Sequence, residues 1–216
     1  VLTPELSLWG YPSNDLLLKK NLIQNQYQIL DQLSLEIKKK YGNLSITVGI
    51  AEIINDSFFP NLYNSIALIE GGEWKIIARK IILPTYEVFD EKRYFRSGEK
   101  VSILEKKFED KVWKIGITIC EDLWVNKNID GRGQHKENPI SDLKEKKIDI
   151  LLNFSASPFT LNKINDRKKV STFAAKKLNI PIVYINQIGG NDDLVFDGNS
   201  FILDKNGKVI QELKSC

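Results

Sequence analysis

Residues 113–124 read WKIGITICEDLW, which combines a strand pattern with a cysteine and two acids. A continuous apolar run over residues 112–120, rich in β-branched side chains, predicts a buried strand of a covered sheet. The run ends in Cys120, and the two acids Glu121 and Asp122 follow at once. Neighbouring carboxylates raise the pKa of a thiol and make it less reactive, so the stretch raises the question of what this cysteine does.

Helical and strand patterns alternate on both sides of this stretch. Helical spacing covers residues 21–41, with a start predicted at Ser13 or Asn14 and a stop at Gly42. A second set of helical patterns covers residues 137–147 and 165–178. Strand patterns cover residues 45–53, 63–70, 73–82, 101–104, 148–156, 180–187, 197–204 and 208–213. This order predicts one layered α/β domain over residues 1–216, with mixed sheets covered by helices.

Composition excludes several classes of protein. Apolar residues make up 42% of the chain and charged residues 27%, as in ordinary globular domains. The net charge of +3 is spread along lysine-rich helix faces, which does not favour a nucleic-acid partner. No apolar run is long enough to span a bilayer, and no signal-peptide pattern is present. Two cysteines far apart in sequence indicate a reducing, cytoplasmic setting.

The start of the chain suggests a piece of a longer protein. The sequence contains no methionine and opens with VLTPELSLWGYP, as if inside a strand. We therefore expect further elements before Val1, with a processed or engineered full chain as the alternative.

Three predicted strands end in residues that could share one reaction. Glu5 follows VLTP, Lys80 follows KIIAR, and Cys120 follows KIGITI. In α/β folds reactive groups gather just past the carboxyl ends of strands. A nearby lysine would reverse the effect of the acids on the pKa of the thiol, and a carboxylate could take the thiol proton during attack. The alternative is a buried structural cysteine, a surface lysine and a capping glutamate.

Other reactive arrangements are poorly supported by the sequence. His135 is the one histidine, and its setting DGRGQHKEN is typical of an exposed loop, which argues against a cysteine–histidine pair. One histidine and two cysteines are too few for a typical zinc site. Residues 188–194, IGGNDDL, lack the pattern of a phosphate-binding loop and place acids where phosphates would lie, so we predict a turn there.

The motifs together resemble a known family. PELSLWGYPSNDLL, RKIILPTYEVFDEKRYF, KIGITICEDLW, NFSASPFTLNK and VYINQIGGNDDLVFDGNSFILD are similar to the nitrilase-type, glutamine-hydrolysing domain of glutamine-dependent NAD synthetases. They occur in family order over nearly the whole chain. The resemblance implies a nitrilase-like four-layer αββα sandwich with two mixed sheets. It also implies that a first strand and helix before Val1, and a C-terminal synthetase domain, lie outside this chain.

The resemblance assigns roles to individual residues. Glu5 matches the general base, Lys80 the catalytic lysine and Cys120 the nucleophile of an amide hydrolysis through a thioester. The residues that match the glutamine-binding positions are Tyr11, Tyr86, Phe89, Glu121, Ser157 and Lys163. Of these, Lys163 suits the α-carboxylate and Glu121 the α-ammonium group, while core, capping or solvated roles remain alternatives. Glu91 is either a further active-site carboxylate or an ion-pair partner of Lys92 or Arg93.

The resemblance also implies partners. Glutamine is the expected substrate, a synthetase domain of the same protein would use the ammonia, and homo-oligomers are expected. No cofactor is expected in this domain, because ATP and magnesium belong to the synthetase half. A free-standing amidase for another small amide and a non-catalytic module packed on a synthetase partner are the alternatives. Cys216 ends the chain, and we assign it no role.

Overall fold

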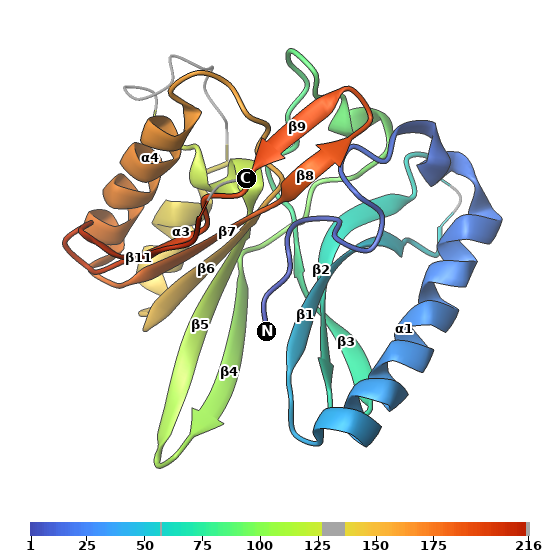
Figure 1. The fold of residues 1–216 in the computed structure, drawn as a ribbon, viewed down its shortest axis with the longest axis horizontal. Helices are drawn as coiled ribbons and strands as arrows, with labels where there is room; N and C mark the ends of the chain where they lie inside the picture. The colour runs from blue at the N-terminus through green and yellow to red at the C-terminus, as the bar shows by residue number, and fades with distance from the viewer. Residues whose placement is uncertain (57, 127–136, 215–216) are drawn as a thin grey trace.

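A computed structural model of the chain describes residues 1–56, 58–126 and 137–214. Apart from one short hairpin, the described strands form two facing sheets (Figure 1). One sheet has the order β1-β2-β3 and is antiparallel, with bounds Ile46–Ile53, Leu62–Glu70 and Glu73–Arg79. Gly71 and Gly72, both at positive φ, form the tight turn between β2 and β3.

The second sheet is mixed and has the order β11-β10-β7-β6-β5-β4 over the described residues. Its central strands β5 to β7 run parallel, and antiparallel pairs flank them at both edges. The bounds are β4 Ser102–Phe108, β5 Lys111–Ile119, β6 Ile150–Ser155, β7 Ile182–Asn186, β10 Phe201–Leu203 and β11 Val209–Glu212. Parallel neighbours place the carboxyl ends of β5, β6 and β7 at one edge of the sheet.

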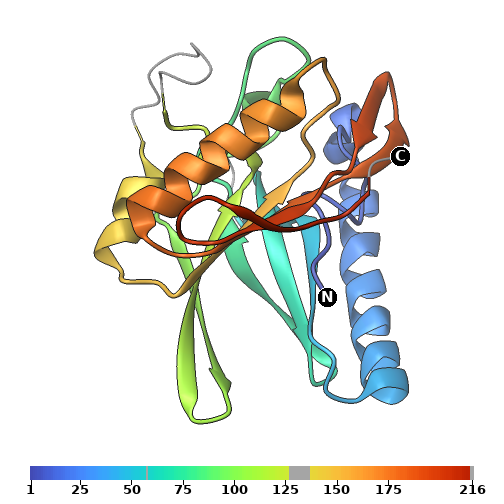
Figure 2. The same cartoon turned by 60° about the vertical axis from the view of Figure 1, so that its left-hand side comes forward.

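Helices cover the outer faces of both sheets. Helix α1 (Lys20–Tyr41) lies on the β1-β2-β3 sheet, and α3 (Pro139–Glu145) and α4 (Lys163–Leu178) lie on the mixed sheet (Figures 1 and 2). The four layers confirm the αββα sandwich predicted for the chain.

Each interface between layers has its own apolar cluster. Between the sheets, Ile66 of β2 packs with Ile119 and Phe154 of the mixed sheet. Under α1, Leu30 contributes to a cluster with Ile50. Full burial of one such aliphatic or aromatic side chain stabilises the fold by roughly 1.5–3 kcal/mol. These clusters fix the spacing of the layers, and with it the distance between strand ends of opposite sheets.

The start of the first helix differs from the prediction. A short 3-10 helix, η1 (Asn14–Leu18), comes first, and α1 begins only at Lys20. The Ser13 hydroxyl donates to the carbonyl of Gly10 and makes no cap. The hydroxyl thus stabilises the preceding turn, an alternative that serine side chains commonly adopt. The predicted stop is confirmed, since α1 ends at Gly42, whose φ is 63°.

Residues 188–194 form more than the predicted turn. Strands β8 (Ile188–Asn191) and β9 (Leu194–Asp197) make a hairpin whose tip is Asp192 and Asp193. The strand signal is weak there because two glycines and a short length leave little apolar alternation. A second difference concerns residues 1–4, expected to form a strand, where only Leu2 pairs, through an isolated parallel bridge to Thr47.

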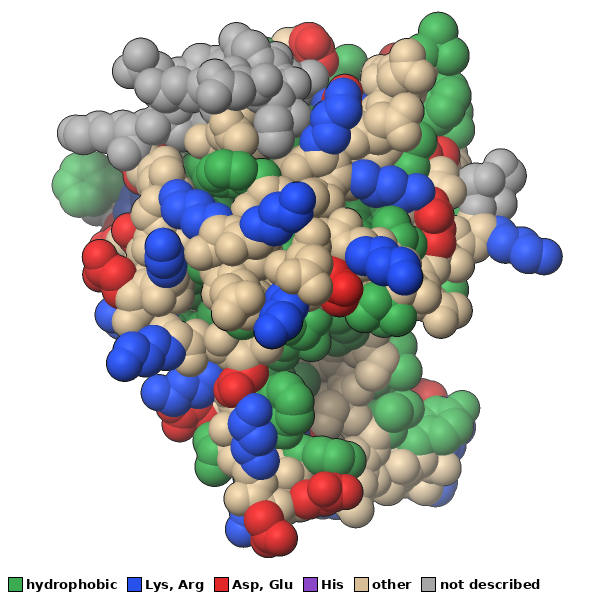
Figure 3. Space-filling view, turned by 90° about the vertical axis from the view of Figure 1, so that its left-hand side faces the viewer, with side chains coloured by type: hydrophobic (Ala, Val, Ile, Leu, Met, Phe, Trp, Pro, Cys, Tyr) green, Lys and Arg blue, Asp and Glu red, His purple; other side chains and the backbone are tan. Residues whose placement is uncertain are grey.

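Surface charge agrees with the composition. Lysine and arginine side chains are spread singly, with acids between them, over the face that carries α3 and α4 (Figure 3). Among the described residues no helix is long and apolar enough to cross a membrane. His135 and Cys216, considered above, lie outside the described residues.

Candidate active site

Glu5 and Lys80, 75 residues apart in sequence, meet in the interior. The Lys80 Nζ atom lies 2.7 Å from Glu5 Oε1, and both side chains are fully buried. Lys80 directly follows β3, and Cys120 directly follows β5 of the opposite sheet. The buried Cys120 thiol is close enough to Glu5 and Lys80 for both to affect its pKa. The structure therefore brings the three predicted strand-end residues to one place.

Glu5 is held by contacts from both sheets. Its Oε1 atom accepts hydrogen bonds from Lys80 and from the Asn64 side chain, at 2.7 Å each. Its Oε2 atom accepts one from the backbone N–H of Ala156, at 3.1 Å. The backbone of residues 4–6 approaches Gly49 of β1 so closely that a Cβ there would lie 2.2 Å from the Leu6 nitrogen. Only glycine at position 49 allows the approach that places Glu5.

Glu91 is the fourth member of the site, beside Glu5, Lys80 and Cys120. Its Oε1 atom lies 2.6 Å from Lys80 Nζ and accepts a hydrogen bond from the Tyr11 hydroxyl at 2.8 Å. Of the two alternatives left open by the sequence, the ion pair with Lys92 or Arg93 is not observed among the described residues. Glu91 pairs with Lys80, and Arg93 pairs with Asp15.

The pKa values of Glu91 and Lys80 follow from their burial and from the short distances between their charges. Burial raises the pKa of Glu91 to about 7, against the lowering effect of Lys80. Burial alone would lower the pKa of Lys80, but Glu5 and Glu91 raise it well above its usual value. Lys80 is therefore a permanent ammonium shared between two carboxylates.

Cys120 is a buried thiol in a strained position. Burial, followed by the charge of Glu5, raises its pKa well above the usual value, and Lys80 offsets only part of this. The expectation that a lysine would reverse the balance is therefore wrong, because desolvation and nearby carboxylates outweigh one ammonium. The Cys120 φ of +48° lies in the left-handed region, which costs a non-glycine residue roughly 1–2 kcal/mol.

The predicted aromatic residues lie together beside this group. The Tyr86 hydroxyl donates to Glu121 Oε2 at 2.8 Å. Ring centroids of Tyr86 and Phe89 are 5.3 Å apart, and those of Tyr11 and Phe89 are 6.2 Å apart. Tyr11, Tyr86, Phe89 and Glu121 thus form one wall, built from residues 84–90, the turn after β5 and the N-terminal segment.

Ser157 and Lys163 make other contacts. The Ser157 hydroxyl accepts a hydrogen bond at 3.0 Å from Nε of Arg167, a fully buried side chain of α4. Arg167 also pairs with Asp197 of β9 at 2.7 Å. The Lys163 ammonium lies 4.4 Å from the ring centre of Trp124, the residue that follows the turn of Cys120. Lys163 is therefore near that turn, while Ser157 belongs to the Arg167 network.

Asn64 and Arg167 were not singled out from the sequence. Asn64 lies within β2 and Arg167 within α4, and the sequence pattern around each residue is that of an ordinary surface position. A polar residue within an apolar strand such as NSIALIE is the one available signal for Asn64. Among the described residues, no group of three or more His, Cys, Asp or Glu side chains has the arrangement of a metal site.

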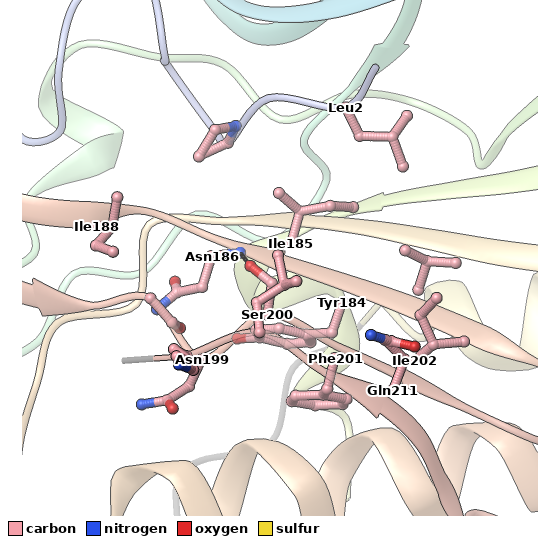
Figure 4. Close-up of a pocket in the computed structure, with 15 residues that line it drawn as sticks. Leu2, Tyr184, Ile185, Asn186, Ile188, Asn199, Ser200, Phe201, Ile202 and Gln211 are labelled. Atoms are coloured by element: carbon pink, nitrogen blue, oxygen red, sulfur yellow. Dashed lines mark hydrogen bonds between the residues drawn. The ribbon is translucent and has the colours of Figure 1, made fainter. Parts of the chain in front are cut away.

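A separate cavity of about 410 Å³ lies between the N-terminal segment and strands β7 and β10 (Figure 4). Its walls are mostly apolar and include Leu2, Ile185 and Ile202, and Asn186 and Ser200 are among its polar members. Figure 4 shows Ile185 directed toward Leu2, whereas Tyr184 and Phe201 lie on the side of the helix layer. Cys120 does not line this cavity, which is therefore distinct from the charged group.

Comparison with known proteins gives consistent matches. The sequence profile of the carbon–nitrogen hydrolase family matches residues 1–215. Glutamine-dependent NAD(+) synthetase of Synechocystis sp. is 40% identical over 213 residues, which are 97% of this chain and 37% of that protein. The enzyme of the same name from Acinetobacter baylyi is 35% identical, over 97% of this chain and 34% of its own length. The chain thus spans about a third of the length of these curated relatives.

Solved structures show the same fold. Glutamine-dependent NAD+ synthetase from Acinetobacter baumannii superimposes with a TM-score of 0.81 at 35% identity, over 99% of this chain and 36% of that one. An amidase of the nitrilase superfamily from Nesterenkonia superimposes with a TM-score of 0.74 at 17% identity, over 100% of this chain and 73% of that one. At this lower identity the likeness concerns the fold alone.

Proposed function

The chain belongs to the carbon–nitrogen hydrolase family, and on that premise we propose that it hydrolyses the side-chain amide of glutamine through a thioester on Cys120. The observation that carries the proposal is the buried pair of Lys80 Nζ and Glu5 Oε1, 2.7 Å apart, beside a thiol at the end of β5. Relatives named for their dependence on glutamine support the choice of substrate.

Glu5 is the proposed general base, and its two oxygens have different tasks. Oε1 is occupied by Lys80 and Asn64, whereas Oε2 receives one backbone N–H. Oε2 therefore has the free lone pair that accepts the Cys120 proton as sulfur attacks the amide carbon. A thiol with a raised pKa needs such a base, because little thiolate exists at rest.

Lys80 and the turn after Cys120 stabilise the charge that develops. As the C–S bond forms, the carbonyl oxygen becomes an oxyanion, which the Lys80 ammonium and the Glu121 backbone N–H would bind. Collapse of this intermediate breaks the C–N bond, and the nitrogen leaves as ammonia with the proton held by Glu5. Water then gives a proton to Glu5 and adds to the thioester. The thiolate leaves, takes back that proton and releases glutamate.

The wall of Tyr11, Tyr86, Phe89 and Glu121 is proposed to bind the substrate. Glu121, oriented by Tyr86, would bind the α-ammonium group, and Phe89 with Tyr11 would contact the aliphatic stem. Lys163 would bind the α-carboxylate. Ser157, whose hydroxyl is already bound by Arg167, would hold the neighbouring loop rather than the substrate.

The ammonia is proposed to serve a synthetase domain of the same protein. The relatives that match this chain are about three times as long and are named NAD(+) synthetases. ATP and magnesium would act in that other part, and assembly as a homo-oligomer is part of the same proposal. A free-standing amidase for another small amide is the second candidate, and a non-catalytic module is the third.

Covalent labelling tests the proposal. The protein is treated with an electrophilic glutamine analogue, with and without excess glutamine, and analysed by intact-protein and peptide mass spectrometry. We expect one adduct on Cys120, prevented by glutamine and much slower in Lys80→Ala. A panel of small amides, with glutamine as reference, separates the first candidate from the second. Absent labelling, or equal labelling of Cys120 and Cys216, contradicts the proposal and favours the non-catalytic module.

A further inference from the structure

Asp122 joins the two strand ends that carry Lys80 and Cys120. Its Oδ1 atom accepts backbone hydrogen bonds from Ile81 at 3.0 Å and from Ile82 at 2.7 Å, the two residues directly after Lys80. Its Oδ2 atom accepts one from Ile119 at 3.0 Å, the residue directly before Cys120. One carboxylate thus binds the backbone of both facing sheets at their junction.

The position of this carboxylate excludes a direct part in proton transfer. Asp122 is 2% exposed, and three backbone N–H groups surround its two oxygens. Two of these N–H groups belong to the residues after Lys80, and the third belongs to Ile119, the last residue of β5. A buried N–H without a partner is costly, so the carboxylate stabilises the junction of the sheets by accepting from three buried donors.

The backbone conformation of Cys120 depends on support from hydrogen bonds such as those of Asp122. Its backbone is in the left-handed region, with φ +48°, and a strained conformation persists only where the surroundings hold it. The bond from Ile119 to Asp122 closes the chain around Cys120, and the bonds from Ile81 and Ile82 tie that closed turn to the strand end that carries Lys80.

We propose that Asp122 is the positioning residue of the site, which sets the distance and orientation between the Cys120 thiol and the Lys80 ammonium. The inference rests on the proposed function, because it assigns Asp122 a role in the reactivity of Cys120. It goes beyond that function in naming a residue that touches neither substrate nor reacting atoms. Misplacement by about 1 Å in a catalytic site can reduce the rate about a hundredfold.

Two substitutions at Asp122 test the inference. Asp122→Asn keeps the shape but turns an NH₂ group toward at least one of the three backbone donors. Asp122→Glu keeps the charge and moves it by one methylene group. The matched control is Asp110→Asn, at an exposed position in the turn at the opposite end of β5. Each protein is assayed for the rate of Cys120 alkylation by iodoacetamide, followed by intact mass spectrometry, and for kcat and KM with glutamine.

The expected result is a loss of rate without a loss of binding. For Asp122→Asn we expect alkylation of Cys120 in a single phase, about tenfold to a hundredfold slower than in the wild type. The kcat should fall by a similar factor while KM changes less than about threefold, because Asp122 does not touch the proposed glutamine-binding wall. Asp110→Asn should equal the wild type. If Asp122→Asn does not fold, the same single slow phase is expected of Asp122→Glu.

A merely structural role gives a different result. If Asp122 only supports folding, alkylation is biphasic, with a folded fraction that reacts at the wild-type rate, and kcat per folded molecule is unchanged. That outcome, or wild-type rates in Asp122→Glu, overturns the inference. A wild-type protein that alkylates rapidly at Cys120 but leaves glutamine intact contradicts the proposed substrate, and the alkylation rates still decide the role of Asp122.

Discussion

The Nζ atom of Lys80 lies 2.6 Å from Oε1 of Glu91, so that one buried ammonium is shared by two carboxylates, those of Glu91 and Glu5. Desolvation of three charges is costly, and their mutual attraction offsets it only while all three are present. The site is therefore a unit in which the loss of one member changes the charge state of the others.

Removal of the shared ammonium should destabilise the fold. Lys80→Met leaves Glu5 and Glu91 buried side by side, and we expect a loss of about 3–5 kcal/mol in the free energy of unfolding. The double variant Lys80→Met with Glu91→Gln removes one carboxylate and should recover part of that loss. Urea denaturation measures the stability of both variants, with Lys75→Met, exposed on β3, as control. A Lys80→Met protein as stable as the wild type would show that the charges are not desolvated.

Glu91 should make stability depend on pH. Its pKa of about 7 in the folded protein exceeds the usual 4.5, so the folded state retains a proton that the unfolded chain loses between these values. The stabilisation from this proton is full below about pH 4.5 and is lost as pH rises through 7, by up to about 3 kcal/mol. The Glu91→Gln variant has no carboxyl group at this position, so its stability does not fall in this way as the pH rises.

The stability of Glu91→Gln relative to the wild type should therefore increase from pH 5 to pH 8. Urea denaturation at several pH values measures the difference, and Glu145→Gln, exposed at the end of α3, is the control. A difference that stays constant over this range would contradict the shifted pKa.

Asn64 should affect catalysis through its contact with Glu5. Its side chain donates to Glu5 Oε1 at 2.7 Å and orients the proposed base. In Asn64→Ala the lost hydrogen bond to a charged group should reduce kcat/KM about tenfold to a hundredfold at neutral pH. Steady-state assays measure the effect, with Asn55→Ala, at an exposed position, as control. An unchanged kcat/KM in Asn64→Ala would separate Asn64 from the proposed base.

Tyr86 should act on glutamine binding. Its hydroxyl orients Glu121 through a 2.8 Å hydrogen bond, and Tyr86→Phe removes this donor. We expect KM for glutamine to rise about tenfold with kcat nearly unchanged, in line with a loss of about 1.5 kcal/mol. Tyr41→Phe, at the exposed end of α1, is the control in steady-state assays. A fall in kcat at constant KM would instead place Tyr86 in the chemical step.

Ser157 should contribute to stability more than to binding. Its hydroxyl accepts from Arg167 Nε at 3.0 Å, so Ser157→Ala leaves a buried guanidinium short of one acceptor. We expect a loss of about 1–3 kcal/mol in the free energy of unfolding, with KM for glutamine unchanged. Thermal or urea unfolding and steady-state kinetics measure the two effects, with exposed Ser97→Ala as control. A raised KM at unchanged stability would return Ser157 to the glutamine site.

Much of the fold could be predicted from the sequence because apolar periodicity reports which face of each element is buried. The strands at 45–53, 63–70 and 112–120 and the helix at 21–41 follow this pattern, and their observed bounds agree within a residue or two. The strand ends that carry Lys80 and Cys120 could be found in the same way. Short or glycine-rich strands, such as β8 and β9, have too little periodicity to be read.

The layers of this protein and the chemical groups at its strand ends follow from local patterns in the sequence. The contacts that those groups make depend on how the layers pack. Glu91 pairs with Lys80, Asn64 with Glu5, and Asp122 with backbone beyond β3. Such contacts join residues far apart in the chain, and the pKa of Cys120 depends on the burial they create. Desolvation and hydrogen bonding arise from the packing of two sheets, which no single stretch of sequence contains.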